Sequence, residues 1–513
     1  MRRHPHLLEI SAWPWLERLS RQERRRVTLA DVPGEAWDAL RDRGFDAVFL
    51  MGVWQRSAVG RLLARVDLAL LGEYDRALPG WAMRDIPGSP YSVSAYEPDE
   101  RMGGWRGLSA ARRALNERGM ALVLDFVTNH TAFDHPWVLA HPERYVLGTL
   151  EDYRAAPDGF RPVQDDGRVH FVACGRDPYF PPWRDVAQLN YFNPETREAM
   201  RGVLREIARH ADGVRCDMAM LVLNEVFEGT WGGLLRGSWR RPGEEFWPEA
   251  IASAPMMYLA EVYWGLERQL QQAGFDFTYD KGLLDALLGS GPGEARRHVR
   301  ATSEEAGRLA RFLENHDEAR SAVRLEHRLP AAATLLCTLP GMRFFFDGQL
   351  EGARVRAPVQ LGRWQEEPSD PRIQNLYERL LDLASSPVFH EGEWRLLEVA
   401  EAGSLTFENL IAYRWRSGER LVIVAVNPGA AAAQGHVRFE ADSDLPPGGA
   451  FDLQDRLDGR SYRWARQPLA HRGLYVRLEP GQAHAFEVRP AAFMPPPEES
   501  GDAQARRGAS LSR

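Results

Sequence analysis

The sequence predicts an α/β protein: a (β/α)8 TIM barrel with an inserted domain after its third strand, followed by a C-terminal all-β sandwich domain. Three observations predict this fold class. Short apolar runs alternate with amphipathic segments through most of the chain, one excursion between two of these elements is far longer than an ordinary loop, and the pattern turns β-rich after about residue 390. The first observation predicts the barrel, the second the inserted domain and the third the C-terminal domain.

Eight apolar runs are the predicted barrel strands. Continuous apolar runs are typical of parallel strands buried on both faces, and the helical segments between them predict βα units. The helix predicted over residues 193–211 opens with an Asn-Pro-Glu start signal. Eight such units favour a closed barrel, with a doubly wound open sheet as the alternative. The runs cover residues 6–13, 45–54, 120–127, 213–220, 256–264, 275–279, 309–315 and 341–348.

The remaining segments predict the other domains. The stretch between the third strand and the next helix is rich in Pro, Gly and aromatic residues, and a loop that long is normally functional or a small subdomain. After the barrel come short β-rich runs separated by turns, and the polar, Pro-rich end is predicted to be disordered. The predicted divisions are residues 1–129 and 193–390 for the barrel, 130–192 for the inserted domain, 391–489 for the all-β domain and 490–513 for the tail.

Composition narrows the kind of partner. The net charge of −8 argues against a nucleic-acid backbone as the main partner, and no window approaches 18 unbroken apolar residues, so no membrane span is expected. Three cysteines form neither a disulfide framework nor a metal knuckle, and the first residues lack the apolar core of a signal peptide. We expect a cytoplasmic protein with no nucleic-acid or membrane partner; the oligomeric state stays open.

The stretch "DGVRCDMAM", residues 212–220, places charge in a buried strand. Arg215 and Asp217 are two residues apart and therefore project from the same face. Buried charge without a partner is costly, so the pair is either a structural ion pair or part of a functional site.

Other predicted strands also end in polar side chains, and this favours the functional site. Active sites of such barrels lie at the carboxyl ends of the strands. Four strands together bring carboxylates, imidazoles and a guanidinium to that end: Asp125, Asn129 and His130 from the third, Arg215 and Asp217 from the fourth, Glu261 from the fifth, and His316 and Asp317 from the seventh.

Paired carboxylates in such a site are what cleavage of a glycosidic bond needs, one as nucleophile and one as protonated acid. Asp217, held by Arg215, is expected to keep a low pKa and stay ionised, which suits a nucleophile. Glu261 is followed by "VYW", and this apolar, aromatic company predicts a raised pKa, which suits a general acid.

Four segments resemble, in order, the short signature regions of the α-amylase family, glycoside hydrolase family 13. They are "DFVTNH", "DGVRCDMAM", "LAEVYW" and "FLENHDEAR". "GSPYSVSAY" (88–96) and "LPGMRFFFDGQLEG" (339–352) are similar to two further family segments. The resemblance spans roughly residues 40–350, and it implies that the long insertion is the family's domain B and the β-rich end its domain C.

The resemblance implies a role for each matching residue. Asp217 would be the nucleophile that forms a covalent glycosyl-enzyme, Glu261 the acid/base, and Asp317 a third carboxylate that grips sugar hydroxyls. Such a mechanism retains the anomeric configuration and requires the first two carboxylates to lie about 5–5.5 Å apart.

The implied substrate-binding residues surround these three acids. Arg215 would orient the nucleophile, and Tyr91 would stack on the sugar. The aromatic face of Trp264 is a further expected sugar contact, because it follows Glu261 closely. The full predicted set is Tyr91, Asp125, His130, Arg215, Trp264 and His316.

The sequence departs from the family where some members bind calcium. Asn129 stands at a family ligand position, but "AQLN" (187–190) lacks the acidic residue that calcium-binding members carry. Calcium binds through several oxygens, usually including carboxylates. We therefore expect no required cofactor and doubt a structural calcium; the alternative role for Asn129 is a hydrogen bond that pins the inserted domain.

The expected function is that of a retaining α-glycosidase acting on α-glucans or malto-oligosaccharides. The alternative is a transglycosidase or isomerase with the same site, of the glucanotransferase or trehalose synthase type. A more remote alternative, a non-catalytic carbohydrate-binding barrel, is disfavoured because Asp217, Glu261 and Asp317 are all present. Linkage and chain-length preference stay open.

Overall fold

The eight predicted strands close into a parallel barrel in a computed structural model that describes residues 1–165, 167–235, 237–289, 291, 293–440 and 444–491. The strands follow one another around the barrel in chain order, and the last pairs with the first. The predicted barrel is confirmed and the open sheet is wrong. The barrel strands are β1 (His6–Ser11), β2 (Ala47–Met51), β5 (Ala121–Val127), β11 (Gly213–Asp217), β12 (Met257–Ala260), β13 (Phe277–Tyr279), β14 (Leu309–Arg311) and β15 (Met342–Phe346).

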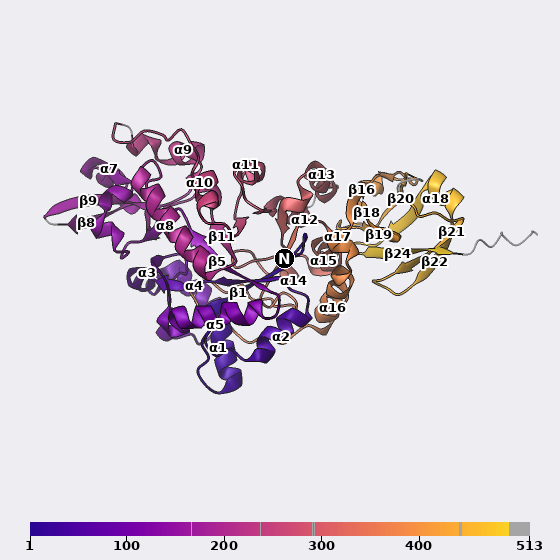
Figure 1. The fold of residues 1–513 in the computed structure, drawn as a ribbon, viewed down its shortest axis with the longest axis horizontal. Coiled ribbons are helices and arrows are strands. Elements are labelled where there is room, and N and C mark those ends of the chain that lie inside the picture. Colours follow the sequence, from indigo (N-terminus) through magenta and orange to yellow (C-terminus); the bar gives the residue numbers. More distant parts are fainter. Residues whose placement is uncertain (166, 236, 290, 292, 441–443, 492–513) are drawn as a thin grey trace, which may run out of the picture.

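Helices cover the outside of the barrel (Figure 1). α8 shows why they begin where they do: the Asn193 side chain accepts a hydrogen bond from the Glu195 N–H, and Pro194 occupies the first helical position. No helix in the described part of the chain is long and apolar enough to cross a membrane. The main helices are α1 (Ala12–Glu23), α2 (Gly34–Asp42), α5 (Gly104–Asn116), α8 (Pro194–His210), α9 (Asn224–Leu235), α10 (Phe246–Ser253), α11 (Glu267–Gln272), α12 (Lys281–Leu288), α13 (Glu294–Ala301), α14 (Ser321–Arg324), α15 (Leu329–Thr338), α16 (Pro371–Ser385) and α17 (Val388–Glu391).

Two excursions leave the carboxyl end of the barrel. The first follows β2 and holds β3 (Trp54–Arg56), α3 (Ala58–Ala64), α4 (Leu68–Ala77) and β4 (Val93–Pro98). The second follows β5 and forms an antiparallel sheet ordered β6-β10-β9-β7, with β8 paired to β9. Its strands are β6 (His130–Ala132), β7 (Leu147–Gly148), β8 (Phe160–Asp165), β9 (Arg168–Gly175) and β10 (Trp183–Gln188), and its helices are α6 (Trp137–Ala140) and α7 (Leu150–Ala155). Because β6 starts directly beyond β5, this inserted domain borders the strand ends where chemistry is expected.

The C-terminal domain is a two-sheet sandwich at the opposite end of the molecule from the inserted domain (Figure 1). One sheet has the order β16-β18-β19-β24-β21-β22 and the other β17-β20-β23, and apolar side chains of both share one core. The strands are β16 (Glu393–Leu397), β17 (Val399–Ala400), β18 (Ile411–Ser417), β19 (Arg420–Val426), β20 (Ala433–Val437), β21 (Ala450–Asp455), β22 (Ser461–Ala465), β23 (Leu474–Leu478) and β24 (Ala483–Ala491), with α18 (Arg466–Arg472) between β22 and β23.

The start of the predicted disordered tail needs a correction. Pro490 and Ala491 belong to β24, where they pair with Phe451 and Ala450 of β21. A neighbouring strand supplies the ladder partners that composition alone does not reveal. The rest of the predicted tail, residues 492–513, lies outside the described residues.

Candidate active site

One guanidinium joins acids from three barrel strands. Arg215, on β11, donates from Nη1 to Asp217 at 2.8 Å and to Asp125 at 3.2 Å, and from Nη2 to Glu261 at 2.7 Å. All four side chains are buried. The pair that stood out in the sequence is therefore part of a larger cluster of charge, which is more than a structural ion pair needs.

The expected low pKa of Asp217 is wrong. Burial raises the pKa of this carboxyl, and the opposing effect of Arg215 does not overcome it. The physical reason is that the single positive charge of Arg215 is divided among three carboxylates, while the nearby Asp317 repels the ionised form further.

Glu261 has the raised pKa that the sequence predicts, but not for the predicted reason. Burial raises its pKa to about 7, against the effect of Arg215. Its surroundings are polar: Tyr263 donates its hydroxyl to Oε1 at 2.8 Å, and the Met218 N–H donates to Oε2 at 2.7 Å. Exclusion of water, and not apolar contact, makes this group a proton carrier near neutral pH.

The backbone is strained beside both acids. Met218, directly after Asp217, has φ of 42°, and Trp264, three residues after Glu261, has φ of 65°. Residues other than glycine rarely adopt this left-handed backbone conformation, and those that do are often found at functional sites. The strained turn at Met218 is also what points its N–H at Glu261.

The loop after β14 brings a second cation into the cluster. His316 Nε2 lies 3.1 Å from Asp317 and 2.7 Å from the hydroxyl of Tyr91, and the Tyr91 and His316 rings are stacked with centroids 5.3 Å apart. Burial would lower the pKa of His316, but Asp317 and Glu9 hold it well above its usual value. Partial burial would likewise raise the pKa of Asp317, yet the imidazolium lowers it to about 2. Asp317 is thus ionised at neutral pH, and half of its side chain is exposed to an arriving ligand.

Glu9 belongs to the site and was missed by the sequence analysis. It lies on β1, fully buried, with Oε1 2.5 Å from His316 Nδ1 and Oε2 accepting from the His316 backbone N–H at 3.3 Å. The signal was present in "HLLEISAW", where a lone carboxylate interrupts an apolar strand. Like Arg215 and Asp217, Glu9 is a charged residue within a buried strand and therefore needs a partner.

Asp125 and His130 support the cluster from β5 and β6. Asp125 accepts from the Gly52 N–H at 3.2 Å, and burial raises its pKa to about 7. Burial lowers the pKa of His130 to about 4, so the ring is neutral, and its Nε2 donates to the Tyr91 carbonyl at 3.2 Å. In this structure His130 holds the backbone of Tyr91, whose ring lies 5.4 Å from the Arg215 guanidinium carbon.

Trp264 takes part in none of the hydrogen bonds described above and lies at an aromatic rim. Its ring meets the edge of Tyr179 with centroids 5.0 Å apart, and 39% of the side chain is exposed. Tyr179 and Phe180, from the inserted domain, are 71% and 66% exposed. Buried Asp177 accepts from the backbone N–H of both, which fixes their loop. The sequence predicted Trp264 alone; the two partners are invisible without the fold.

The residues around Asn129 do not fit a calcium site. Its side-chain oxygen accepts from the amide of Gln188 at 2.9 Å, and its amide donates back to Gln188 at 3.0 Å. Calcium needs several oxygens, usually with carboxylates among them, and here the amide oxygen already has a partner. The paired amides connect the end of β5 with β10, so Asn129 pins the inserted domain.

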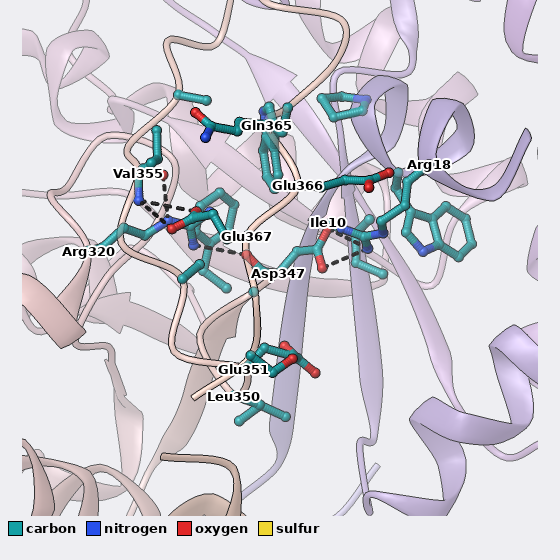
Figure 2. Close-up of a pocket in the computed structure, with 18 of the residues that line it drawn as sticks. Ile10, Arg18, Arg320, Asp347, Leu350, Glu351, Val355, Gln365, Glu366 and Glu367 are labelled. Carbon is teal, nitrogen blue, oxygen red and sulfur yellow. Dashed lines mark hydrogen bonds and ion pairs between the residues drawn. The ribbon is translucent and has the colours of Figure 1, made fainter. Parts of the chain in front are cut away.

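A separate cavity of about 480 Å³ lies between α1 and the segment that follows β15 (Figure 2). None of the predicted site residues lines it. Its charged groups pair with one another: Arg18 with Asp347 at 2.9 Å, and Arg43 with Glu351 at 2.9 Å. The cavity is therefore not the site of the acids at the barrel end.

Comparison with known proteins agrees with the fold and the motifs. No protein-family model matches the chain. Alpha-amylase 3 of Dictyoglomus thermophilum is 23% identical over 279 residues, which cover 50% of this chain and 52% of that protein. The alpha-1,4-glucan:maltose-1-phosphate maltosyltransferase of Rhodospirillum rubrum is 23% identical over 475 residues, covering 86% of this chain and 60% of that protein. The chain thus spans between about half and 60% of the length of these two relatives.

Among solved structures, the noncanonic maltogenic alpha-amylase AmyB from Thermotoga neapolitana aligns with 94% of this chain and 98% of its own, with a TM-score of 0.67 and 20% sequence identity. At 20% identity, this structural likeness shows a common fold and nothing more. In sequence the chain is thus similar to enzymes of the α-amylase family, and its fold is that of a solved alpha-amylase.

Proposed function

We propose that the chain is a retaining glycosidase of α-glucans, with Asp217 as nucleophile and Glu261 as acid/base. The observation that carries the proposal is that one guanidinium holds both buried carboxylates at 2.8 and 2.7 Å. Carboxylates on neighbouring nitrogens of Arg215 lie close together, as a retaining mechanism requires.

The proposed reaction has two steps. An Asp217 oxygen bonds to the anomeric carbon as the glycosidic C–O bond breaks, and Glu261 gives its proton to the departing oxygen. Water then attacks the anomeric carbon, gives a proton to Glu261 and releases Asp217. Two displacements at the same carbon restore its configuration.

The charges of the cluster support these roles of Asp217 as nucleophile and Glu261 as acid/base. Among the described residues, five carboxylates of the cluster make ion pairs with two cations, while Arg356 acts on Asp317 from farther away. A pKa of about 7 makes Glu261 a suitable proton donor near neutral pH. The ionised Asp317 is suited to accept hydrogen bonds from sugar hydroxyls. The carboxylates are Glu9, Asp125, Asp217, Glu261 and Asp317, and the cations are Arg215 and His316.

The aromatic rim suits the part of the glucan that leaves. Rings of Tyr179, Phe180 and Trp264 are exposed, and Trp264 follows the acid that protonates the leaving oxygen. A pyranose ring has an apolar face, which can pack against an exposed aromatic ring. We therefore assign this rim to the sugars on the leaving-group side of the broken bond.

The second candidate function is transglycosylation with the same residues, and similarity to a maltosyltransferase favours it. The first step would be the same, and a sugar hydroxyl would replace water in the second. An occupied aromatic rim would favour that outcome by keeping a sugar where water must otherwise arrive.

Product analysis decides between these functions. The purified protein is incubated with maltose, maltotriose, maltoheptaose, trehalose, sucrose and glycogen, with Asp217→Asn as the blank. Shorter products alone, first released with the α configuration in proton NMR, support the retaining hydrolase. Longer or isomerised sugars support the transferase, and a first product of inverted configuration would overturn the mechanism. No turnover by the unaltered protein would leave a carbohydrate-binding barrel as the better reading.

A further inference from the structure

We propose that Glu9 is a positioning residue of this site: it keeps His316 protonated and oriented, so that the second ring N–H faces Asp317 and Tyr91. The role of the site rests on the function proposed above, but the state of His316 can be measured without it. In the described part of the chain the Glu9 carboxylate hydrogen-bonds His316 and no other residue of the site, so its effect must pass through His316.

The geometry makes this contact specific. Two oxygens of one carboxylate engage His316, one at the ring Nδ1 and one at the backbone N–H, at 2.5 and 3.3 Å. The two contacts fix both the ring and the backbone of the loop that follows β14. The backbone of Glu9 is fixed within β1, which pairs with β2 and β15, and its side chain is fully buried.

Two groups face the opposite edge of the ring, the Asp317 carboxylate, which can only accept, and the Tyr91 hydroxyl, which can accept or donate. Nε2 lies 3.1 Å from Asp317 and 2.7 Å from Tyr91. A neutral imidazole with its proton on Nδ1 would turn a lone pair toward the ionised Asp317, which is repulsive. The doubly protonated ring donates at both edges instead, and Asp317 is held in place for the sugar.

Charge facing His316 comes from each element around it. Glu9 on β1 and Asp317 on the same loop are in contact with the ring, and Tyr91 stacks on it. The charge of His316 also lowers the pKa of Asp125 on β5 and of Asp217 on β11, against the larger effect of burial. Arg215 is the cation among these groups, and it is already shared by three carboxylates. Loss of Glu9 would remove one of the two carboxylates that contact the ring.

The test follows the imidazole directly. Histidine ring carbons are labelled, the His316 signal is assigned by its loss in His316→Gln, and the signal is titrated between pH 5 and 9 by NMR. We expect no titration in the unaltered protein. In Glu9→Gln, which keeps the size of the side chain, the midpoint should fall by at least about one pH unit and enter this range.

The matched control is Asp455→Asn. Asp455 is a buried carboxylate that also contacts a histidine Nδ1, that of His484, but in the C-terminal domain. This variant should leave the His316 signal unchanged. Glu9→Asp keeps the charge, so it should restore at least part of the high midpoint, which separates charge from packing.

Activity supplies the second readout. In Glu9→Gln the alkaline limb of kcat/KM should move to lower pH and steepen, because His316 then loses its proton together with Glu261. A uniform loss at every pH with an unmoved His316 signal would overturn the proposal and leave Glu9 a structural residue. If no glucan is turned over, the imidazole titration still decides the inference, so its failure is distinguishable from that of the proposed function.

Discussion

The two ends of the barrel each bury a cluster of ionisable side chains, and the two clusters are made of opposite chemistry. At the carboxyl end, acids outnumber the cations Arg215 and His316. At the amino end, histidines meet arginines: His4, His6 and His390 lie beside Arg2 and Arg343. Most side chains of both clusters are buried, so the comparison shows what the residue types contribute.

The amino-end histidines are held neutral. His4 Nδ1 accepts the Gly341 N–H at 2.9 Å, and His390 Nδ1 donates to the His4 carbonyl at 3.0 Å. Burial, assisted by Arg343, lowers the pKa of His4 to about 3 and that of His390 to about 4. The His4 ring packs against Trp415 of β18, so this cluster fastens the barrel to the C-terminal domain.

Burial favours the neutral form at both ends, but with different chemical results. A buried acid that is neutral carries a proton it can give away, as Glu261 can near pH 7. A buried histidine that is neutral is a hydrogen-bonding group only. We therefore expect substitutions at the carboxyl end to change activity, and substitutions at the amino end to change stability.

The largest effect is expected for Asp217→Asn. Activity should fall by at least about 10⁴-fold, because the nucleophile is lost. The melting temperature should stay the same or rise, since one negative charge leaves a crowded buried cluster. Steady-state rates on maltoheptaose and thermal unfolding check this. A large drop in melting temperature would show that Asp217 is needed for the fold, contrary to the expected difference between the two ends of the barrel.

Glu261→Gln should lower kcat/KM by about 10²–10⁴-fold. The acid must be protonated to act, so activity of the unaltered protein should decline as pH rises through about 7, and the variant should lose this limb. Rates measured between pH 5 and 9 test both statements. An alkaline limb that persists unchanged in the variant would assign it to a different group.

The amino-end cluster predicts how stability depends on pH. Folded His390 has a lowered pKa, so the unfolded chain binds more protons in the interval between about pH 4 and the ordinary histidine value. Stability should be fully present above about pH 6.5 and be lost as pH falls toward 4. By pH 4.5 His390 should account for roughly 1–3 kcal/mol. His390→Gln should flatten this dependence in urea unfolding, whereas the exposed His471→Gln should not.

The smallest effect concerns the aromatic rim. Tyr179→Ala should lower kcat/KM for maltoheptaose by about five- to tenfold, as loss of one aromatic contact of about 1 kcal/mol implies, and affect maltose less. Tyr475→Ala, which removes an exposed tyrosine from the C-terminal domain, is the control. Equal losses of kcat/KM on maltose and maltoheptaose would show that the rim does not bind the sugars of longer substrates.

Much of the barrel was predictable, because each strand carries its own signal. Runs such as "MALVLDFV" are apolar throughout, and the polar residues that follow them mark the carboxyl end. Asp125, Arg215, Asp217, Glu261 and the His316–Asp317 pair were all found in this way, and contacts join them in the structure. The strand pairing of Pro490 and Ala491 was not, since it depends on a distant partner strand.

The helices and strands, the acids at the strand ends and the similarity to one enzyme family can be found from sequence alone, because these are local properties of short segments. How charge is shared among the acids depends on contacts between distant segments, so it could be found from the fold and not from the sequence. Glu9 and His316 are 307 residues apart in the chain, yet they are in contact. Burial raises the pKa of Asp217, and the positive charge of Arg215, shared by three carboxylates, does not overcome this effect. A pKa depends on burial and on every charge within a few ångströms, and those neighbours are set by how the barrel closes.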